Sequence, residues 1–353
     1  MTHKQKVQLL TGFALAAGLL TWFLHGQNWS EIGAAFARAK LVYLAGLVLC
    51  TIVGYILRSW RWGYLYRPLA RVPFKDLLSA TYIGFMSALL VPRSGEVLRP
   101  YLIARRHPVS TSSGFATVIL ERLIDLITVL TLFALYLYIL PVPAQEKSGA
   151  LEMHLPLVGT IAGRGLTGVA ILGLLAVCLT FLFGADRAMK VADWIFARLP
   201  QKIGAPLGRL GHSFGEGLAV LKAPVGLLAA IFGQSVLLWL SIAVAFYFNN
   251  LAFGIVLPFH STFLLIAFLT VGVGTATPGG VGGFHLAYLL AMRCYGVPDE
   301  TGVAAGISAH ALTNLPVLVI GLVFLAGEGL TMGKVAALAG GEAAEPTAKD
   351  GKR

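Results

Sequence analysis

The sequence predicts an all-α polytopic membrane protein with about six full spans and two re-entrant helical hairpins, arranged in two inverted halves. Of its 353 residues, 57% are hydrophobic and only 12% are charged, whereas a soluble domain carries about 25% charged residues. Apolar stretches of about 20 residues, long enough to cross the hydrocarbon of a bilayer, recur along the chain. Two further apolar stretches are broken by proline and glycine at corresponding places in the two halves.

The first half supplies three of the expected spans. They lie at 7–24, 41–62 and 113–140, with an amphipathic segment at 29–40 outside the membrane. The first apolar run is longer than that of a signal peptide, so we expect a retained helix. The second span ends in the basic and aromatic stretch "RSWRWGYLYRPLARVPFK". Such an edge is typical of the cytoplasmic face, where Arg58 and Arg61 would meet water and Trp60 and Trp62 would anchor in the interface.

The second half repeats this plan. We expect spans at 165–184, 223–248 and 301–327, with a cytoplasmic segment at 186–222. An odd number of spans in each half inverts the second half relative to the first. One transmembrane domain then covers residues 1–330, in halves of about 1–164 and 165–330, and residues 331–353 form a disordered tail. The net charge of +11 is spread over short connections, which is a topology signal and does not indicate nucleic acid.

Each half contains a pair of short apolar helices separated by a break. The first pair spans 76–91 and 95–106 around Pro92 and Gly95, and the second is broken at 277–283. Irregular backbone at membrane depth is tolerated only where it faces protein or a water-filled cavity. Matched breaks in two halves indicate the binding site of a transporter. The helix N-termini after the breaks would favour an anion.

Charged residues gather at the first break and in the span that follows it. They are Arg93, Glu96, Arg99, Glu121, Arg122 and Asp125. Glu96 and Arg99 are three apart on one helix face and are expected to pair. Charges within a span face a cavity or a partner, and these six sum to zero. Two interpretations stay open: a network that only stabilises the fold, or a site where Arg93 or Arg99 contacts a lipid phosphate.

The second break carries few charges. Its candidate residues are Pro278, Gly279, Gly280, Gly282, His285, His310 and Asn314. A single histidine in an apolar helix is more often a packing residue than a ligand, and the dispersed histidines predict no metal site. Three scattered cysteines predict neither a disulfide nor a metal site. Nucleotide-binding and catalytic motifs are not found, so we expect no cofactor.

Two segments resemble one family. "TYIGFMSALLVPRSGEVLRPYLIARR", followed by "SGFATVILERLIDL", and "TPGGVGGFHLAYLLAMRCYGVP" are similar to the two signatures of the lysylphosphatidylglycerol synthase transmembrane-domain family, also called flippase-like proteins. The matching residues are Pro92, Gly95, Glu96, Arg99, Glu121, Arg122, Asp125, Pro278, Gly279, Gly280 and Gly282. The sequence departs from the family at His285, where glutamate is common, and in the last span, where His310 and Asn314 lie and an arginine is often expected.

The resemblance implies a membrane domain associated with moving lipid between leaflets, alone or fused to an aminoacyltransferase domain. No such domain is expected after residue 330, so we expect a translocase and not an enzyme. Its partners would be membrane lipids with phosphate headgroups, either anionic phospholipids or polyprenyl-phosphate-linked lipids, and a homo-oligomer stays an open alternative. The expected location is a bacterial inner membrane with both termini cytoplasmic. A membrane enzyme acting on a lipid phosphate and a structural or regulatory membrane protein are the alternatives.

Overall fold

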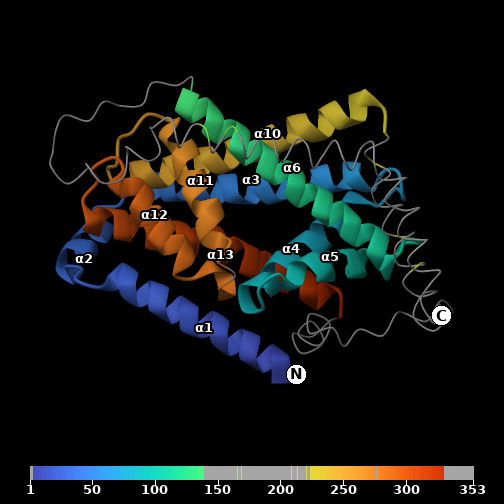
Figure 1. The fold of residues 1–353 in the computed structure, drawn as a ribbon, viewed down its shortest axis with the longest axis horizontal. Helices are drawn as coiled ribbons and strands as arrows, with labels where there is room; N and C mark the ends of the chain where they lie inside the picture. Colours follow the sequence, from blue (N-terminus) through green and yellow to red (C-terminus); the bar gives the residue numbers. More distant parts are fainter. Residues whose placement is uncertain are drawn as a thin grey trace.

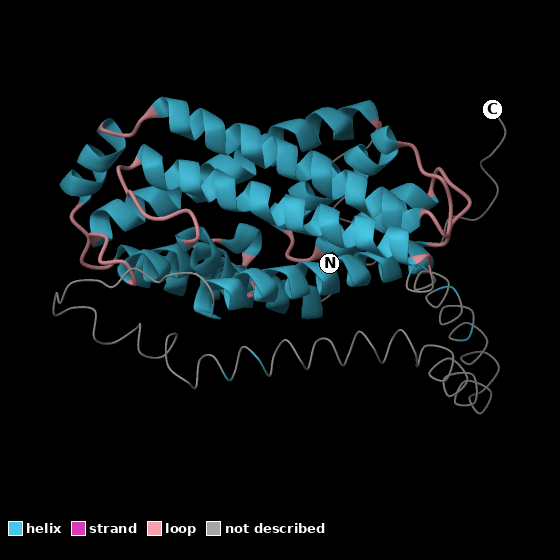
Figure 2. Ribbon diagram, turned by 90° about the horizontal axis from the view of Figure 1, so that it is seen from above, coloured by secondary structure: helices cyan, strands magenta, loops and turns pink. Residues whose placement is uncertain are grey.

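The computed structural model describes residues 3–138, 223–275 and 277–329, together with five isolated positions between the first two ranges. Within these residues the protein is entirely helical, with ten α-helices, one 3-10 helix and no strand (Figures 1 and 2). The expected span at 165–184, the expected cytoplasmic segment at 186–222 and the expected tail at 331–353 lie outside the described ranges, as do residues 141–164.

The helices of the first half follow the expected pattern closely. They are α1 (His3–Leu24), α2 (Trp29–Ala37), α3 (Leu41–Tyr66), α4 (Phe74–Leu90), α5 (Ser94–Ala104) and α6 (Thr111–Tyr138). The described part of the second half contains α10 (Val225–Ala252), α11 (Ser261–Val273), the 3-10 helix η2 (Pro278–Gly280), α12 (Gly283–Arg293) and α13 (Asp299–Gly327).

Local sequence signals explain where several helices begin. The Asn28 side chain accepts hydrogen bonds from the N–H groups of Ser30 and Glu31 and thereby caps α2. Proline stands directly before α4, α10 and α13. Acidic residues in the first turn of α13, Asp299 and Glu300, face the positive end of its dipole.

Three described helices are long and apolar enough to cross a membrane, namely α3, α10 and α13. The equally long α6 differs because Glu121, Arg122 and Asp125 fall near its middle. Ten residues separate Thr111 from Glu121, which places these charges about 15 Å from the start of the helix. The chain is therefore a multi-pass membrane protein, and α6 carries three charges near its middle.

The two broken segments fold into two helix pairs of the same construction. In α4–α5 a methyl group on Gly95 would overlap the Gly84 carbonyl, and in α11–α12 a methyl group on Gly283 would overlap the Gly272 carbonyl. The two glycines of each pair are separated by the same 11 positions in the sequence. Small residues of this kind let helix backbones approach closely in membranes. The two pairs therefore share both the spacing and the kind of close backbone contact.

The outer ends of the two pairs lie on opposite sides of the bundle. At one side, Arg106 after α5 bonds Asp76 at the start of α4. At the other side, Arg293 at the end of α12 bonds Asp299, where α13 begins. Figure 1 shows α4 and α5 toward one end of the long α3 and α10, and α12 toward the other.

The inner ends of the two pairs meet. Gly279 in η2 lies against the end of α4, since a methyl group there would be 3.4 Å from the Leu89 carbonyl oxygen. We call these inner ends the two tips: residues 89–94, which comprise the end of α4 and its turn into α5, and residues 277–282 between α11 and α12. The contact between them confirms that the two breaks, far apart in the sequence, belong to one region of the fold.

Candidate functional site: a buried arginine cluster beside the first tip

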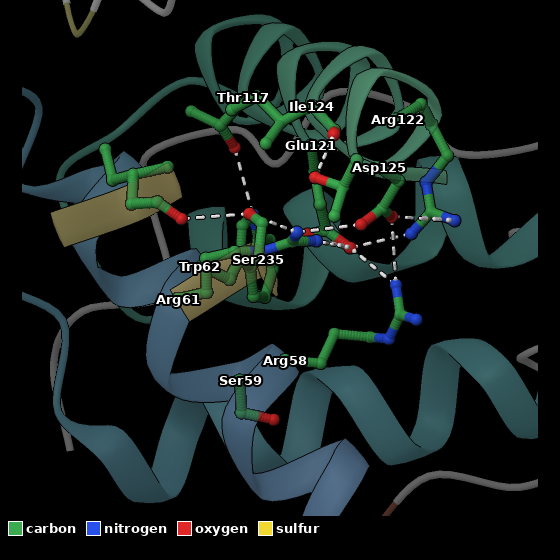
Figure 3. A network of polar contacts seen from close by, with 12 residues as sticks. Arg58, Ser59, Arg61, Trp62, Thr117, Glu121, Arg122, Ile124, Asp125 and Ser235 are labelled. Carbon is green, nitrogen blue, oxygen red and sulfur yellow. Dashed lines mark hydrogen bonds and ion pairs between the residues drawn. The ribbon is translucent and has the colours of Figure 1, made fainter. Parts of the chain in front are cut away.

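Glu121 of α6 is the centre of a charged cluster. Its carboxylate accepts hydrogen bonds from Arg99 of α5 at 2.9 and 3.2 Å and from Arg122 at 2.6 Å. Two further arginines come from α3: Arg58 Nη1 lies 3.3 Å and Arg61 Nη2 lies 3.6 Å from Oε1. Four guanidinium groups thus surround one fully buried carboxylate, and Figure 3 labels three of these arginines, Arg58, Arg61 and Arg122.

Asp125 supplies the second carboxylate, one turn along the same face of α6. Arg61 donates to its Oδ1 at 2.7 Å and Arg58 donates to its Oδ2 at 3.2 Å. From α10, Trp239 donates its indole N–H to Oδ1 at 3.0 Å, and Ser235 accepts a hydrogen bond from Arg61 at 2.7 Å. The site is therefore assembled from α3, α5, α6 and α10.

The arginine cluster, defined as Arg58, Arg61, Arg99, Glu121, Arg122 and Asp125, has excess positive charge. Four guanidinium groups, which stay protonated in proteins, stand against two carboxylates, a net charge of +2. Some of their donors are also unused: Nε and Nη2 of Arg61 and the Nε atoms of Arg99 and Arg122 are buried without a hydrogen-bond partner. Buried charge without a partner is costly, and these unused donors have the chemistry to bind an anion.

Aromatic rings cover the guanidinium groups. Arg99 lies 4.2 Å from the Trp62 ring centroid, and Arg58, Arg99 and Arg122 all lie within 5.8 Å of the Phe85 ring centroid. Such stacking favours the cationic form and fixes the orientation of each guanidinium. Arg122 is the one arginine of the four with a partly accessible side chain, 40% exposed against 10% or less for the others. It is therefore the accessible edge of the cluster.

Several predictions about these charges were wrong. Arg99 pairs with Glu121 and not with Glu96, because α5 packs its Arg99 face against α6. Glu96 makes no salt bridge to a described residue, and Arg93 is exposed. The predicted neutral network of six is thus replaced by a cluster of net +2. Even if the half-buried Glu96 were counted with it, the net charge would be +1.

The α3 residues were misplaced by sequence reasoning. Arg58 and Arg61, expected at the aqueous edge, are 9% and 0% exposed, and Trp62, expected in the interface, is fully buried with its N–H on Thr117. Trp60 is 48% exposed, as an interfacial anchor would be. The sequence spacing could have indicated the pairing of α3 with α6. Arg58 and Arg61 are three apart and share one face of α3, and Glu121 and Asp125 are four apart and share one face of α6. Ser235 and Trp239 carried no such signal.

The glycines of the second tip adopt backbone conformations that other residues avoid. Gly279, Gly280 and Gly282 have φ values of 60°, 72° and 83°, in the left-handed region that glycine enters without steric cost. Gly282 also lies against Ala16 and Leu19 of α1. Pro278 is buried at the first position of η2. In the first tip the corresponding strain falls on Arg93, with φ 63°.

The remaining predicted residues form a group beside the second tip. His285 and His310 have ring centroids 4.6 Å apart, so neither is an isolated packing histidine. His310 Nε2 bonds the Gly279 carbonyl at 2.8 Å. The Asn314 amide donates to the His310 carbonyl within α13. No group of three or more metal-binding side chains occurs in the described part of the chain.

A separate open hollow lies between α3 and α13. Its volume is ≈ 490 Å³, and it is lined by apolar residues of the first half of α3 and by Leu312. The lining contains none of the arginine cluster. The cavity expected around the tips is thus not this hollow, which is an apolar surface of the kind that faces lipid chains.

Comparison with known proteins confirms the family that the two signature segments resemble. The family described as "Lysylphosphatidylglycerol synthase TM region" matches residues 9–321. "Glycosyltransferase AglD" of Haloferax volcanii is 28% identical over 89% of this chain, and the chain spans about half, 52%, of the length of that relative. A "UPF0104 membrane protein" of Methanothermobacter thermautotrophicus is 23% identical, over 87% of this chain and 90% of its own length.

Proposed function

Because the chain belongs to the lysylphosphatidylglycerol synthase transmembrane-region family, we propose that it is a lipid translocase. It would move an anionic phospholipid or a polyprenyl-phosphate-linked lipid between leaflets. The observation that carries this proposal is the net charge of +2 in the arginine cluster, within a multi-pass membrane protein.

The chemistry of the cluster favours phosphate as the anion. An unpaired charge at the centre of a membrane helix costs about 3 kcal/mol on insertion scales, so a bound anion would stabilise the protein. A guanidinium group binds two phosphate oxygens at once through parallel N–H groups. Arg122 is the accessible residue of the cluster and would make the first contact. The headgroup would enter here while the lipid chains remain in the bilayer.

The arrangement of the helix pairs supports a topology for this activity. The proposed topology has about six full spans and two re-entrant hairpins that enter from opposite faces, in two inverted halves. The first pair has basic residues at its outer ends, Lys75, Arg105 and Arg106, which favours the cytoplasmic side. Both termini would then be cytoplasmic, in a bacterial inner membrane. The contact of the tips would separate the two aqueous sides.

Leaflet movement of fluorescent anionic lipids in proteoliposomes tests the proposal. Accessible label is destroyed with a membrane-impermeant reductant, and the rate at which protected label becomes accessible is compared with protein-free vesicles. Faster exchange of at least one anionic lipid is expected. Exchange at the protein-free rate for phosphatidylglycerol, phosphatidic acid and polyprenyl phosphate alike would exclude a translocase.

Replacing Arg122 with glutamine is expected to slow lipid movement by at least tenfold without unfolding the protein. The substitution removes a bidentate phosphate partner, and tenfold corresponds to about 1.4 kcal/mol. Folding survives because the cluster keeps three guanidinium groups for its two carboxylates. Lipid movement is measured alongside size-exclusion behaviour in detergent.

The matched control for this variant is Arg293→Gln. Arg293 has a similarly exposed side chain, 39%, and a carboxylate partner, Asp299, but it lies at the far end of α12. Its replacement should leave the rate unchanged. A well-folded Arg122→Gln protein that moves lipid at the wild-type rate would remove the arginine cluster from the transport site.

The same preparation separates transport from chemistry. A membrane enzyme that uses Glu121 or Asp125 as a general base would yield a chemically altered lipid. A translocase, which on this proposal needs no cofactor, returns the lipid unchanged. Mass spectrometry of the lipids after incubation distinguishes these outcomes.

A further inference from the structure

His285 and His310 form a buried imidazole pair that the arginine cluster does not use. The two rings come from α12 and α13, and their centroids lie 4.6 Å apart. His285 is 6% exposed and His310 is partly buried. Both rings contact the backbone of the second tip: His310 through the Gly279 carbonyl and His285 through the Gly282 N–H. The pair therefore lies directly behind the contact between the two tips.

The backbone partners determine where the protons of the neutral pair lie. A carbonyl oxygen only accepts, so His310 must carry a proton on Nε2, which donates to Gly279 at 2.8 Å. A backbone N–H only donates, so Nδ1 of His285 must be unprotonated to accept from Gly282 at 3.3 Å. A neutral imidazole has one N–H and one bare nitrogen. The remaining nitrogens are therefore a donor, Nε2 of His285, and a bare base, Nδ1 of His310.

These assignments make the two rings unequal as bases. Protonating His285 would place a hydrogen on Nδ1 and break its bond to Gly282. Protonating His310 at Nδ1 breaks no hydrogen bond described in the structure. Protonation of one ring also disfavours protonation of the other, because two imidazolium rings at this separation repel each other. The pair is therefore expected to bind one additional proton, and the existing hydrogen bonds place that proton on Nδ1 of His310.

We propose that Nδ1 of His310 is a proton-binding site, and that a proton bound there tightens the contact between the two tips. A hydronium ion gives up the proton and leaves as water, so that one O–H bond breaks and one N–H bond forms at Nδ1, and the neutral ring becomes an imidazolium ion. The bond from Nε2 to the Gly279 carbonyl then becomes charge-assisted and about twice as strong. Gly279 is the residue that lies against Leu89 of α4. Proton binding at His310 therefore acts on the point where the two halves meet.

Within the described part of the chain, the titratable side chain in contact with the His310 ring is His285. From α12, Phe284 lies at 5.2 Å between ring centroids, and from α1, Phe23 lies at 5.2 Å from His285. From η2 the contact is the Gly279 carbonyl. Tyr288, also on α12, uses its hydroxyl group in bonds with α10. Aromatic faces around a ring of this kind stabilise a cation.

Histidine NMR on the full-length protein tests the site directly. With nitrogen-15 in the imidazoles, we expect one buried ring that is protonated on Nε2 at high pH and gains a second proton between about pH 8 and pH 4, a window around the usual imidazole range. That signal should be absent from His310→Gln, whose amide still donates to Gly279. It should persist in His285→Asn, whose side-chain oxygen still accepts from Gly282, and in the control His25→Gln, which changes an exposed histidine.

Two NMR results would overturn the site. One is a His310 ring that stays neutral down to about pH 4. The other is a titrating signal that disappears in His285→Asn and persists in His310→Gln, because this result would assign the proton to His285. Neither measurement needs lipid movement, so the proton site is tested even where the translocase proposal fails.

The second part of the proposal, that the bound proton tightens the contact between the tips, rests on the proposed function. It is tested by the pH dependence of lipid movement. The rate of lipid movement in proteoliposomes should vary with pH in the wild type and in His25→Gln and be flat in His310→Gln. An unchanged pH profile in a folded His310→Gln protein would reject the coupling of the proton to the tips.

Discussion

Replacing Gly95 with alanine is expected to prevent the first helix pair from closing and to leave little folded protein. A methyl group at this position would overlap the carbonyl of Gly84 on α4, and the nearby atoms are backbone. Overpacking of a well-packed site typically costs about 1–3 kcal/mol, and here no flexible side chain can move aside. Arg99, which α5 presents to Glu121, would lose its position as well. Thermal unfolding in detergent, followed by size exclusion, measures the loss.

The chain offers both a counterpart and a control for this substitution. Gly283→Ala should fail in the same way, because its methyl group would overlap the Gly272 carbonyl in the second pair. Gly233 lies within α10, and a methyl group there would have no neighbouring atom within 4 Å. Gly233→Ala should therefore be neutral or stabilising, because alanine is the better helix former. If Gly95→Ala unfolds at the wild-type temperature, the close packing of α4 on α5 does not hold the first tip in place.

Replacing Glu121 with glutamine is expected to be the most destabilising change in the arginine cluster. The substitution conserves shape but raises the net charge from +2 to +3 and removes the acceptor shared by four guanidinium groups. Removing one partner of a buried ion pair typically costs about 3–5 kcal/mol. Size exclusion and thermal unfolding in detergent measure the effect. We expect loss of the monodisperse protein or a large fall in its unfolding temperature.

Comparing the loss of stability on removing a cation with the loss on removing an anion distinguishes this cluster from a neutral network. In a balanced network, removing a cation and removing an anion would be comparably harmful. Here Arg122→Gln should be mild and Glu121→Gln severe, because positive charge is already in excess. The double variant Arg99→Met with Glu121→Gln should recover part of the loss, since the two residues are bonded. Glu31→Gln, an exposed change in α2, is the control. Equal losses for Arg122→Gln and Glu121→Gln would contradict the charge excess.

The sequence predicted the helices well because the signals for them are local. Apolar length placed α3, α10 and α13, and proline and glycine placed both breaks, since these residues act on the backbone at their own positions. Glu121, Arg122 and Asp125 were also identified as charges within an apolar helix, because their position in that stretch is visible in the sequence alone.

What escaped prediction depended on which faces of the helices meet. Sequence spacing paired Arg99 with Glu96 on the same helix, but packing of α5 on α6 directs Arg99 to Glu121. The positive residues of α3 resembled an interfacial edge, because arginine is common at membrane surfaces. Only the packing of α3 against α6 and α10 shows that Arg58 and Arg61 are buried.

By itself, then, the sequence determined a helical membrane protein with two broken segments, charged residues within an apolar stretch and the signatures of its family. Only the tertiary structure decided that the tips of the two segments meet, that the charges sum to +2, and that His285 lies against His310. The physical reason is that helix formation and helix breaking are properties of neighbouring residues. A charge excess or a shared proton site belongs to side chains brought together from distant helices, and it exists only once those helices pack.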